Sequence, residues 1–263
     1  MPFPEVKRVV YGKNPLEKVI CQLRFPPILI IDSEIPAKFQ ELIRDEFPHY
    51  EEKIEVQQEI SAEINANYSM NIVNPMTKVI RNKNHTFTSE DGNWQVNLTR
   101  TFISITTNKY NTWEGFKDKF KKPLEALIEV YTPPFFGRIG LRYIDVFCRS
   151  KLGFEDCPWI ELIKPEFLGV LASEVGNYVT QYNNQSEIIF NDNKSRARIL
   201  TSIVKNTLNE DCFMIDNDSY NPEKVLCGEV VDKLDYIHER STRLIRFVIT
   251  DKLHNGMEPE DLC

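Results

Sequence analysis

The stretch Ile215-Asp216-Asn217-Asp218-Ser219-Tyr220 is the part of this sequence most suited to metal chemistry. We predict that it ends a strand, so Asp216 and Asp218 would point the same way and could hold a divalent cation. It departs from the calcium-loop pattern, because no glycine stands at the sixth position and Cys227 replaces the bidentate glutamate. The alternative is a plain strand end followed by a turn.

His238 is the third candidate metal ligand. It lies on a predicted helix, but the sequence His-Glu-Arg-Ser-Thr lacks the second histidine four residues later that a helical zinc site uses. The competing hypothesis is a structural histidine that is satisfied by a carbonyl or by Asp235.

Four arginines fall in predicted strands, where an isolated charge is costly unless it is paired or wet. They are Arg24, Arg100, Arg138 and Arg142. In one interpretation they line a polar sheet face that binds an anion or an acidic partner. In the other, which we favour, each pairs with a carboxylate such as Asp145 or a glutamate of the row Glu55, Glu59 and Glu63.

A basic cluster adjoins aromatic residues in a predicted helix, which is a pattern that nucleic-acid-binding proteins also show. The cluster comprises Lys117, Lys119, Lys121 and Lys122, beside Trp113, Phe116 and Phe120. Because the aromatic residues belong to the helix's apolar stripe, we expect them to be buried and the lysines to form a solvated face.

Several activities are disfavoured because their motifs are missing. The sequence contains no phosphate-binding Gly-x-x-x-x-Gly-Lys, no Gly-x-Gly-x-x-Gly, no Gly-x-Ser-x-Gly and no protein-kinase signature. A formal charge of −7 also argues against a dedicated nucleic-acid binder. Residues 1–150 carry 20 Lys and Arg against 19 Asp and Glu, so an anionic partner would meet this half rather than the acidic remainder.

The cysteines bear on location. The six residues are Cys21, Cys148, Cys157, Cys212, Cys227 and Cys263. They show no Cys-x-x-Cys pair and no zinc spacing, so we interpret them as reduced, mostly buried thiols. The N-terminus has no signal-peptide pattern, and the longest apolar run, Ile28–Ile31, is too short to cross a bilayer. We therefore expect a cytoplasmic protein that makes no contact with a membrane.

The elements that must position these residues follow from hydrophobic periodicity. Apolar stripes predict helices over 35–47, 112–131 and 223–254, and alternating segments predict about ten strands. These elements indicate an α+β fold, in which a large antiparallel or mixed sheet is covered by helices that include a long C-terminal one. We expect one unit, residues 1–263, with pseudo-halves 1–150 and 151–263, because Gln22-Leu23-Arg24-Phe25 echoes Gly140-Leu141-Arg142-Tyr143.

Three groups of motifs carry a resemblance to a known family. They are Asn14–Val19 running into Cys-Gln-Leu-Arg-Phe-Pro-Pro, the middle strand Arg138–Asp145, and the closing segments Leu234–His238 and Phe247–Leu253 with Met257. This set resembles a sporadically distributed family of uncharacterised bacterial proteins of about 250 residues. The resemblance implies a single cytoplasmic unit, and it supplies no catalytic residues.

Three functions remain after these exclusions. The first is a non-catalytic cytoplasmic bacterial binding protein whose partner is another protein or a second copy of this chain, and it implies no cofactor. The second is a metal-dependent enzyme that acts on a phosphorylated or nucleotide substrate through Asp216, Asp218 and His238. The third is weak nucleic-acid binding through the lysine cluster. We favour the first, because the sequence lacks the motifs of a reaction.

Overall fold

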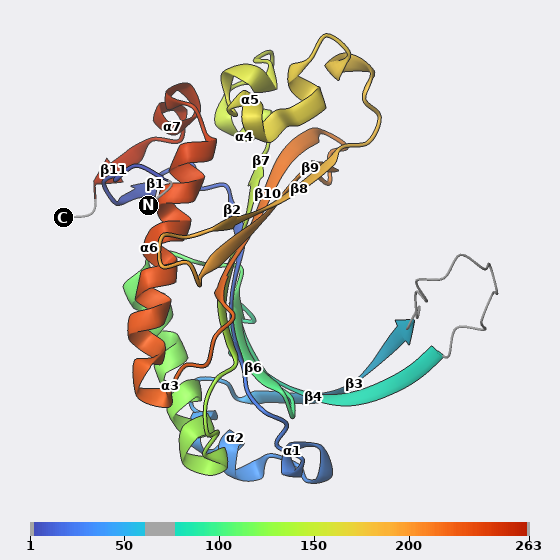
Figure 1. The fold of residues 1–263 in the computed structure, drawn as a ribbon, viewed down its shortest axis with the longest axis vertical. Helices are drawn as coiled ribbons and strands as arrows, with labels where there is room; N and C mark the ends of the chain where they lie inside the picture. Colours follow the sequence, from blue (N-terminus) through green and yellow to red (C-terminus); the bar gives the residue numbers. More distant parts are fainter. Residues whose placement is uncertain (1–2, 61–76, 262–263) are drawn as a thin grey trace.

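A computed structural model of the chain describes residues 3–60 and 77–261. Its centre is a nine-stranded antiparallel sheet in the order β3-β4-β5-β6-β2-β7-β10-β9-β8 (Figure 1). Its strands are β2 (Leu16–Arg24), β3 (His49–Ile60), β4 (Thr77–Thr88), β5 (Trp94–Leu98), β6 (Phe102–Thr107), β7 (Arg138–Phe147), β8 (Asn183–Ile189), β9 (Arg196–Lys205) and β10 (Asp211–Asn221). The α+β class and the large sheet are confirmed.

The helices pack against one face of this curved sheet (Figure 1). They are α1 (Ile30–Ser33), α2 (Ala37–Ile43), α3 (Trp113–Tyr131), α4 (Arg149–Leu152), α5 (Pro165–Leu168), α6 (Val230–Val248) and α7 (Asp251–Gly256), with short 3₁₀ turns at Trp159–Glu161, Gly169–Ala172, Gly176–Tyr178 and Cys227–Glu229. We call the sheet surface under these helices the helix face and the opposite surface the polar face.

The alternation of side chains along each strand explains this division. In β2, the side chains of Val19, Cys21 and Leu23 are fully buried beneath the helices. Gln22 and Arg24, which alternate with them along the strand, are not buried. β7 follows the same rule, with Leu141 and Tyr143 on the helix face and Arg142 on the polar face. Because one register slip would exchange the two faces, the apolar pattern fixes the pairing.

The sheet is arranged about the central β2–β7 pair. Each of the two strands is followed by short helices, by antiparallel strands that pair outward, and by a long helix, α3 or α6 (Figure 1). Gln22 lies directly opposite Gly140, so the two echoing segments are related by the local dyad of the strand pair. The division into pseudo-halves stays a prediction.

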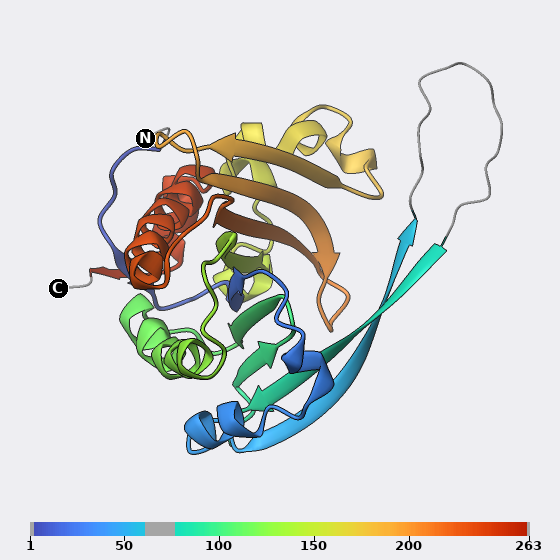
Figure 2. The ribbon, with the colours of Figure 1, turned by 60° about the horizontal axis from the view of Figure 1, so that its bottom comes forward.

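Two pairs of strands lie beyond the helix-covered part of the sheet. β3 and β4 project from the body as a two-stranded arm (Figures 1 and 2). Near the chain ends, β1 (Val9–Tyr11) pairs with β11 (Pro259–Asp261) in a separate two-stranded sheet. This pairing carries the N-terminal segment alongside α6 (Figure 1).

The helix over 112–131 is confirmed, with Thr112 as its N-cap and the helix continuous through Pro123. The helix over 223–254 is shorter than predicted, because α6 starts at Val230 and ends at Val248. Ile249 makes a β-bridge with Ile163, and the Thr250 hydroxyl accepts a hydrogen bond from the Leu253 amide, so a new helix, α7, begins there. The helix over 35–47 is replaced by α2 with α1 before it.

Candidate functional site

The predicted metal ligands do not come together. Asp216 and Asp218 lie inside β10 rather than at its end, with both side chains on the polar face. His238 lies on α6 across the sheet, where its Nδ1 shares a 2.8 Å hydrogen bond with the Tyr143 hydroxyl. Arg142 and Tyr143 are neighbours in one strand and point to opposite faces, so the sheet separates the histidine from both aspartates.

Two of the four arginines occupy both aspartates. The Arg142 guanidinium donates two hydrogen bonds to Asp216, of which the one from Nε is 2.7 Å long. One Nη of Arg138 lies 2.8 Å from each carboxylate oxygen of Asp218. For these two residues the structural interpretation, pairing with a neighbouring carboxylate, is therefore confirmed, although the carboxylates come from β10. The structure does not describe the side chains of Glu55, Glu59 and Glu63, so pairing of an arginine with this row stays a prediction.

The other two arginines differ. Arg100 lies in the turn between β5 and β6 rather than in a strand, with Nε 3.5 Å from an Asp32 carboxylate oxygen. Arg24 is opposite Arg138 in the β2–β7 register and donates to the Gln22 side chain at 3.0 Å. Partial burial and repulsion from Arg138 lower the pKa of Arg24. Among the described arginine side chains of the polar face, Arg24 is the one that contacts no carboxylate, which is the feature expected of an anion-binding group.

The lysine cluster is largely neutralised. Trp113, Phe116 and Phe120 are buried, as predicted. Lys117 donates to Asp235 at 2.7 Å, Lys119 lies 2.9 Å from Glu46, and Lys122 contacts Asp45. These pairs leave this face of α3 little free positive charge for a nucleic-acid backbone.

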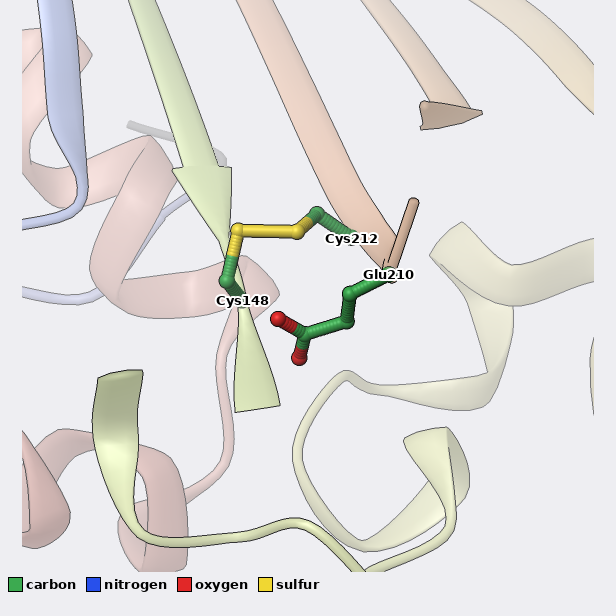
Figure 3. A group of neighbouring side chains, drawn as sticks. All are labelled: Cys148, Glu210 and Cys212. Carbon is green, nitrogen blue, oxygen red and sulfur yellow. A yellow bond between two sulfur atoms is a disulfide. The ribbon is translucent and has the colours of Figure 1, made fainter. Parts of the chain in front are cut away.

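The expectation of reduced thiols is wrong for one pair of cysteines. Cys148 and Cys212 form a disulfide, and their Cα atoms are 4.5 Å apart (Figure 3). Cys148 directly follows β7, and Phe147 pairs with Phe213 of β10, so the antiparallel register brings the two cysteines together. Cys148, Cys212 and Glu210 form the one group of three candidate metal ligands within the described residues. The two sulfurs are bonded to each other and are not thiolate ligands.

A cavity of about 110 Å³ opens between the helix face and the helices that cover it. β7 contributes Tyr143 and Asp145, β10 contributes Asn217, and α6 contributes His238, Ser241, Thr242 and Ile245. Its remaining walls are Arg8 to Tyr11, Asn14, Leu16 and Tyr110 to Trp113. We call this space the Asp145 cavity. Segments from the start, middle and end of the chain meet there.

Among the described residues of the cavity wall, Asp145 is the one carboxylate. The residue is only 7% exposed, and within the described part of the chain neither a cation nor a hydrogen-bond donor contacts its carboxylate oxygens. Burial raises the pKa of Asp145 to about 7. A buried polar group without a partner is rare and costs stability, so it is a candidate for a functional role.

The aromatic and imidazole side chains around Asp145 are uncharged and held in place. Burial lowers the pKa of His238 to about 4, so its ring is uncharged at neutral pH. Trp113 stacks on this ring at a centroid distance of 4.5 Å, and its indole N–H donates to Asp235. Tyr110 meets Tyr143 edge to face, with ring centroids 6.1 Å apart. These contacts hold the aromatic side chains in place beside an uncompensated carboxylate.

Sequence reasoning missed the role of Asp145, which it considered only as a partner for strand arginines. A usable signal exists in the run Arg142-Tyr143-Ile144-Asp145: alternation places Asp145 on the same face as Leu141 and Tyr143, which is the buried face. An aspartate at a buried position of a central strand is uncommon enough to single out.

Comparison with known proteins adds no identity. No protein-family model matches the chain, and no curated protein matches it. Among the described helices, none has the length and apolar character that a membrane crossing requires.

Proposed function

We propose that this chain is a small-molecule binding protein and that the Asp145 cavity is its binding site. The observation that carries the proposal is the buried, unpartnered Asp145 carboxyl in an aromatic-lined cavity. A partly apolar, partly enclosed cavity with a few convergent polar groups is the usual form of a ligand site. The proposal keeps the binding role expected from the sequence and replaces the macromolecular partner with a small ligand.

The alternatives have weaker support. A metal-dependent reaction would need Asp216, Asp218 and His238 in one place, and their side chains lie on different faces of the sheet. Nucleic-acid binding would need free lysines on α3, and three of the four contact carboxylates. On the polar face, Arg138 and Arg142 would have to leave Asp218 and Asp216 to bind an anion. Cytoplasmic location and bacterial origin stay predictions.

A fragment screen on the full chain tests the proposal. We would record amide chemical shifts while adding small polar and apolar fragments to the wild-type protein and to the Asp145→Asn variant. The expected result is at least one fragment that shifts residues lining the cavity, such as Tyr110, Asn217 and Ser241, and that binds the variant differently. A screen in which every responding residue lies outside the cavity would refute the proposal.

A further inference from the structure

The charges that line the Asp145 cavity do not balance. Arg8 and Asp145 are the residues of the described lining that carry a formal charge at neutral pH once Asp145 ionises. The Arg8 guanidinium donates to both oxygens of Glu114, at 3.0 and 3.1 Å, so its charge is already compensated. The charge left without a counterion is the negative one on Asp145.

We infer that the Asp145 cavity binds a small organic ammonium ion, whose charged nitrogen contacts the Asp145 carboxylate and whose alkyl part contacts the aromatic wall. This inference rests on the proposed function and names its ligand class. A cation that enters the cavity removes the cost of a buried, unpaired carboxylate, which a neutral or anionic ligand cannot do. Charge-assisted hydrogen bonds from N⁺–H to a carboxylate are also among the strongest that proteins make.

The hydroxyl groups of the α6 wall suit a hydrogen-bond donor. Ser241 donates its proton to the Ile237 carbonyl at 3.0 Å, and Thr242 donates to the His238 carbonyl at 2.8 Å. Their hydroxyl protons are thereby used, and each oxygen retains acceptor capacity. An ammonium group has donors and no acceptor, which matches this wall.

The aromatic side chains suit the same ligand. Tyr11, Tyr110, Trp113 and Tyr143 all line the cavity. The faces of aromatic rings attract cations, and aromatic side chains beside a carboxylate are a recurrent way to recognise alkylammonium groups. Burial raises the pKa of Tyr11 to about 12 and also raises the pKa of Tyr110 and Tyr143, so these phenols stay neutral and add no competing charge.

The volume limits the ligand to a few carbon atoms. At about 110 Å³ the cavity is smaller than an engineered cavity of about 150 Å³ that binds benzene, and it exceeds the roughly 30 Å³ share of one water. Propylammonium is therefore an appropriate probe. Propan-1-ol and propionate have nearly the same shape as propylammonium. Propan-1-ol is uncharged, and propionate carries a negative charge.

Among the groups that line the cavity, the pH dependence of binding has one source between pH 5 and 8. The titratable groups that face Asp145 are Tyr143 on its own strand, His238 on α6, Tyr110 before α3, and Arg8 and Tyr11 on the N-terminal segment. The tyrosines stay neutral and Arg8 stays charged over this range, and His238, with a pKa of about 4, is already neutral. His254 of α7 contacts Tyr11 at 2.9 Å, but it does not line the cavity, and burial lowers its pKa. Among the lining groups only Asp145 changes its charge, so propylammonium should bind about tenfold more tightly at pH 8 than at pH 6.

The test is a titration of the full chain with each of the three probes, in which amide chemical shifts report binding. We expect propylammonium to bind at least tenfold more tightly than propan-1-ol, and propionate to bind least. Asp145→Asn should weaken propylammonium about 30-fold, which corresponds to about 2 kcal/mol, and should leave propan-1-ol unchanged. Asp216→Asn, which changes a carboxylate on the polar face, is the matched control and should leave all three affinities unchanged.

The outcomes separate the ligand class from the site. If propan-1-ol or propionate binds the cavity as tightly as propylammonium, or if wild-type binding is the same at pH 6 and pH 8, the ammonium inference is wrong and the cavity remains a binding site. If none of the three probes shifts the residues that line the cavity, the inference fails as well. The fragment screen then decides by itself whether the cavity binds any ligand.

Discussion

The two faces of strand β7 differ in whether their charged side chains have partners. On the polar face, Arg138 and Arg142 each contact an aspartate of the neighbouring strand β10. On the helix face, three residues after Arg142, the Asp145 carboxylate is about as buried as Asp216 and has no such partner among the described residues. One strand thus carries paired charges on one side and an unpaired charge on the other.

The difference indicates which charges maintain the fold. A paired charge gives up hydration in exchange for hydrogen bonds within the protein, so its presence is explained by the structure alone. An unpaired buried carboxylate lowers stability and is retained only when something else compensates for it, which is typical of functional sites. The predictions below test this distinction by removing or creating unpaired charges.

The largest effect should come from Asp145 and should depend on pH. Its pKa of about 7 in the folded protein lies above the ordinary value of 3.8, so the folded state binds more protons than the unfolded state between these values. The contribution of Asp145 to the free energy of unfolding therefore falls as the pH rises from 4 to 7. Asp145→Asn should stabilise the protein by up to about 4 kcal/mol at pH 8 and hardly at all at pH 4.

Urea unfolding of the wild type and the variant at both pH values measures this difference. If the Asp145→Asn variant is less stable than the wild type at pH 8, the carboxylate is paired in the wild type. The contrast between the two faces would then disappear. Asp218→Asn is the matched control, because Asp218 contacts Arg138. It should destabilise the protein at pH 8 instead of stabilising it.

The next effect concerns the disulfide beyond the paired aspartates, at the end of β7. Reducing Cys148–Cys212, which closes a loop with a sequence separation of 64, should lower the free energy of unfolding by about 3 kcal/mol. Propylammonium affinity should not change, because neither cysteine lines the Asp145 cavity. Unfolding with and without reductant measures the effect, with Cys148→Ser/Cys212→Ser as the control that reductant should not alter. Because Cys21, Cys157 and Cys227 are free thiols, the sites that a thiol reagent modifies must be located, and modification of Cys148 and Cys212 themselves before reduction would contradict the disulfide.

The sequence predicted the layers well because hydrophobic periodicity carries this information. The stripe beginning at Phe116 predicted α3, and the alternation in Arg138–Phe147 predicted a central strand and the opposite faces of Arg142 and Tyr143. Local pattern failed where a single residue interrupts a longer stripe. Thr250 caps a new helix after Ile249 makes a strand-like contact, and the stripe that crosses them does not show this.

The candidate site could not be assembled from the sequence, because it depends on which strands are neighbours. The pairing of β7 with β10 brings Arg142 to Asp216 and Cys148 to Cys212, across 74 and 64 positions. The cavity further needs the N-terminal segment beside α6, which the β1–β11 pair provides. Neither pairing leaves a spacing that can be detected in one sequence.

A third prediction turns Asp216 into a second unpaired carboxylate. Asp216 is 6% exposed and Asp145 is 7% exposed, and Arg142 provides the two side-chain hydrogen bonds of Asp216. Arg142→Met should therefore lower the free energy of unfolding by about 2 kcal/mol at pH 8, because it leaves the Asp216 carboxylate without its partner. Adding Asp216→Asn to this variant should recover most of the loss. If Arg142→Met alone changes stability by less than about 0.5 kcal/mol, pairing does not separate the two faces.

The smallest effect should come from Arg24, the arginine of the polar face that contacts Gln22 and not a carboxylate. Arg24→Gln removes repulsion from Arg138 and one exposed hydrogen bond, so the two changes largely cancel and stability should shift by less than about 0.5 kcal/mol. Thermal unfolding at low and high salt measures this, and Arg138→Gln, which strips Asp218 of its partner, should be clearly more destabilising. Equal losses from the two substitutions would mean that Arg24 is held by the fold as firmly as its paired neighbour. None of the arginines that the structure describes on the polar face would then be free to bind an anion.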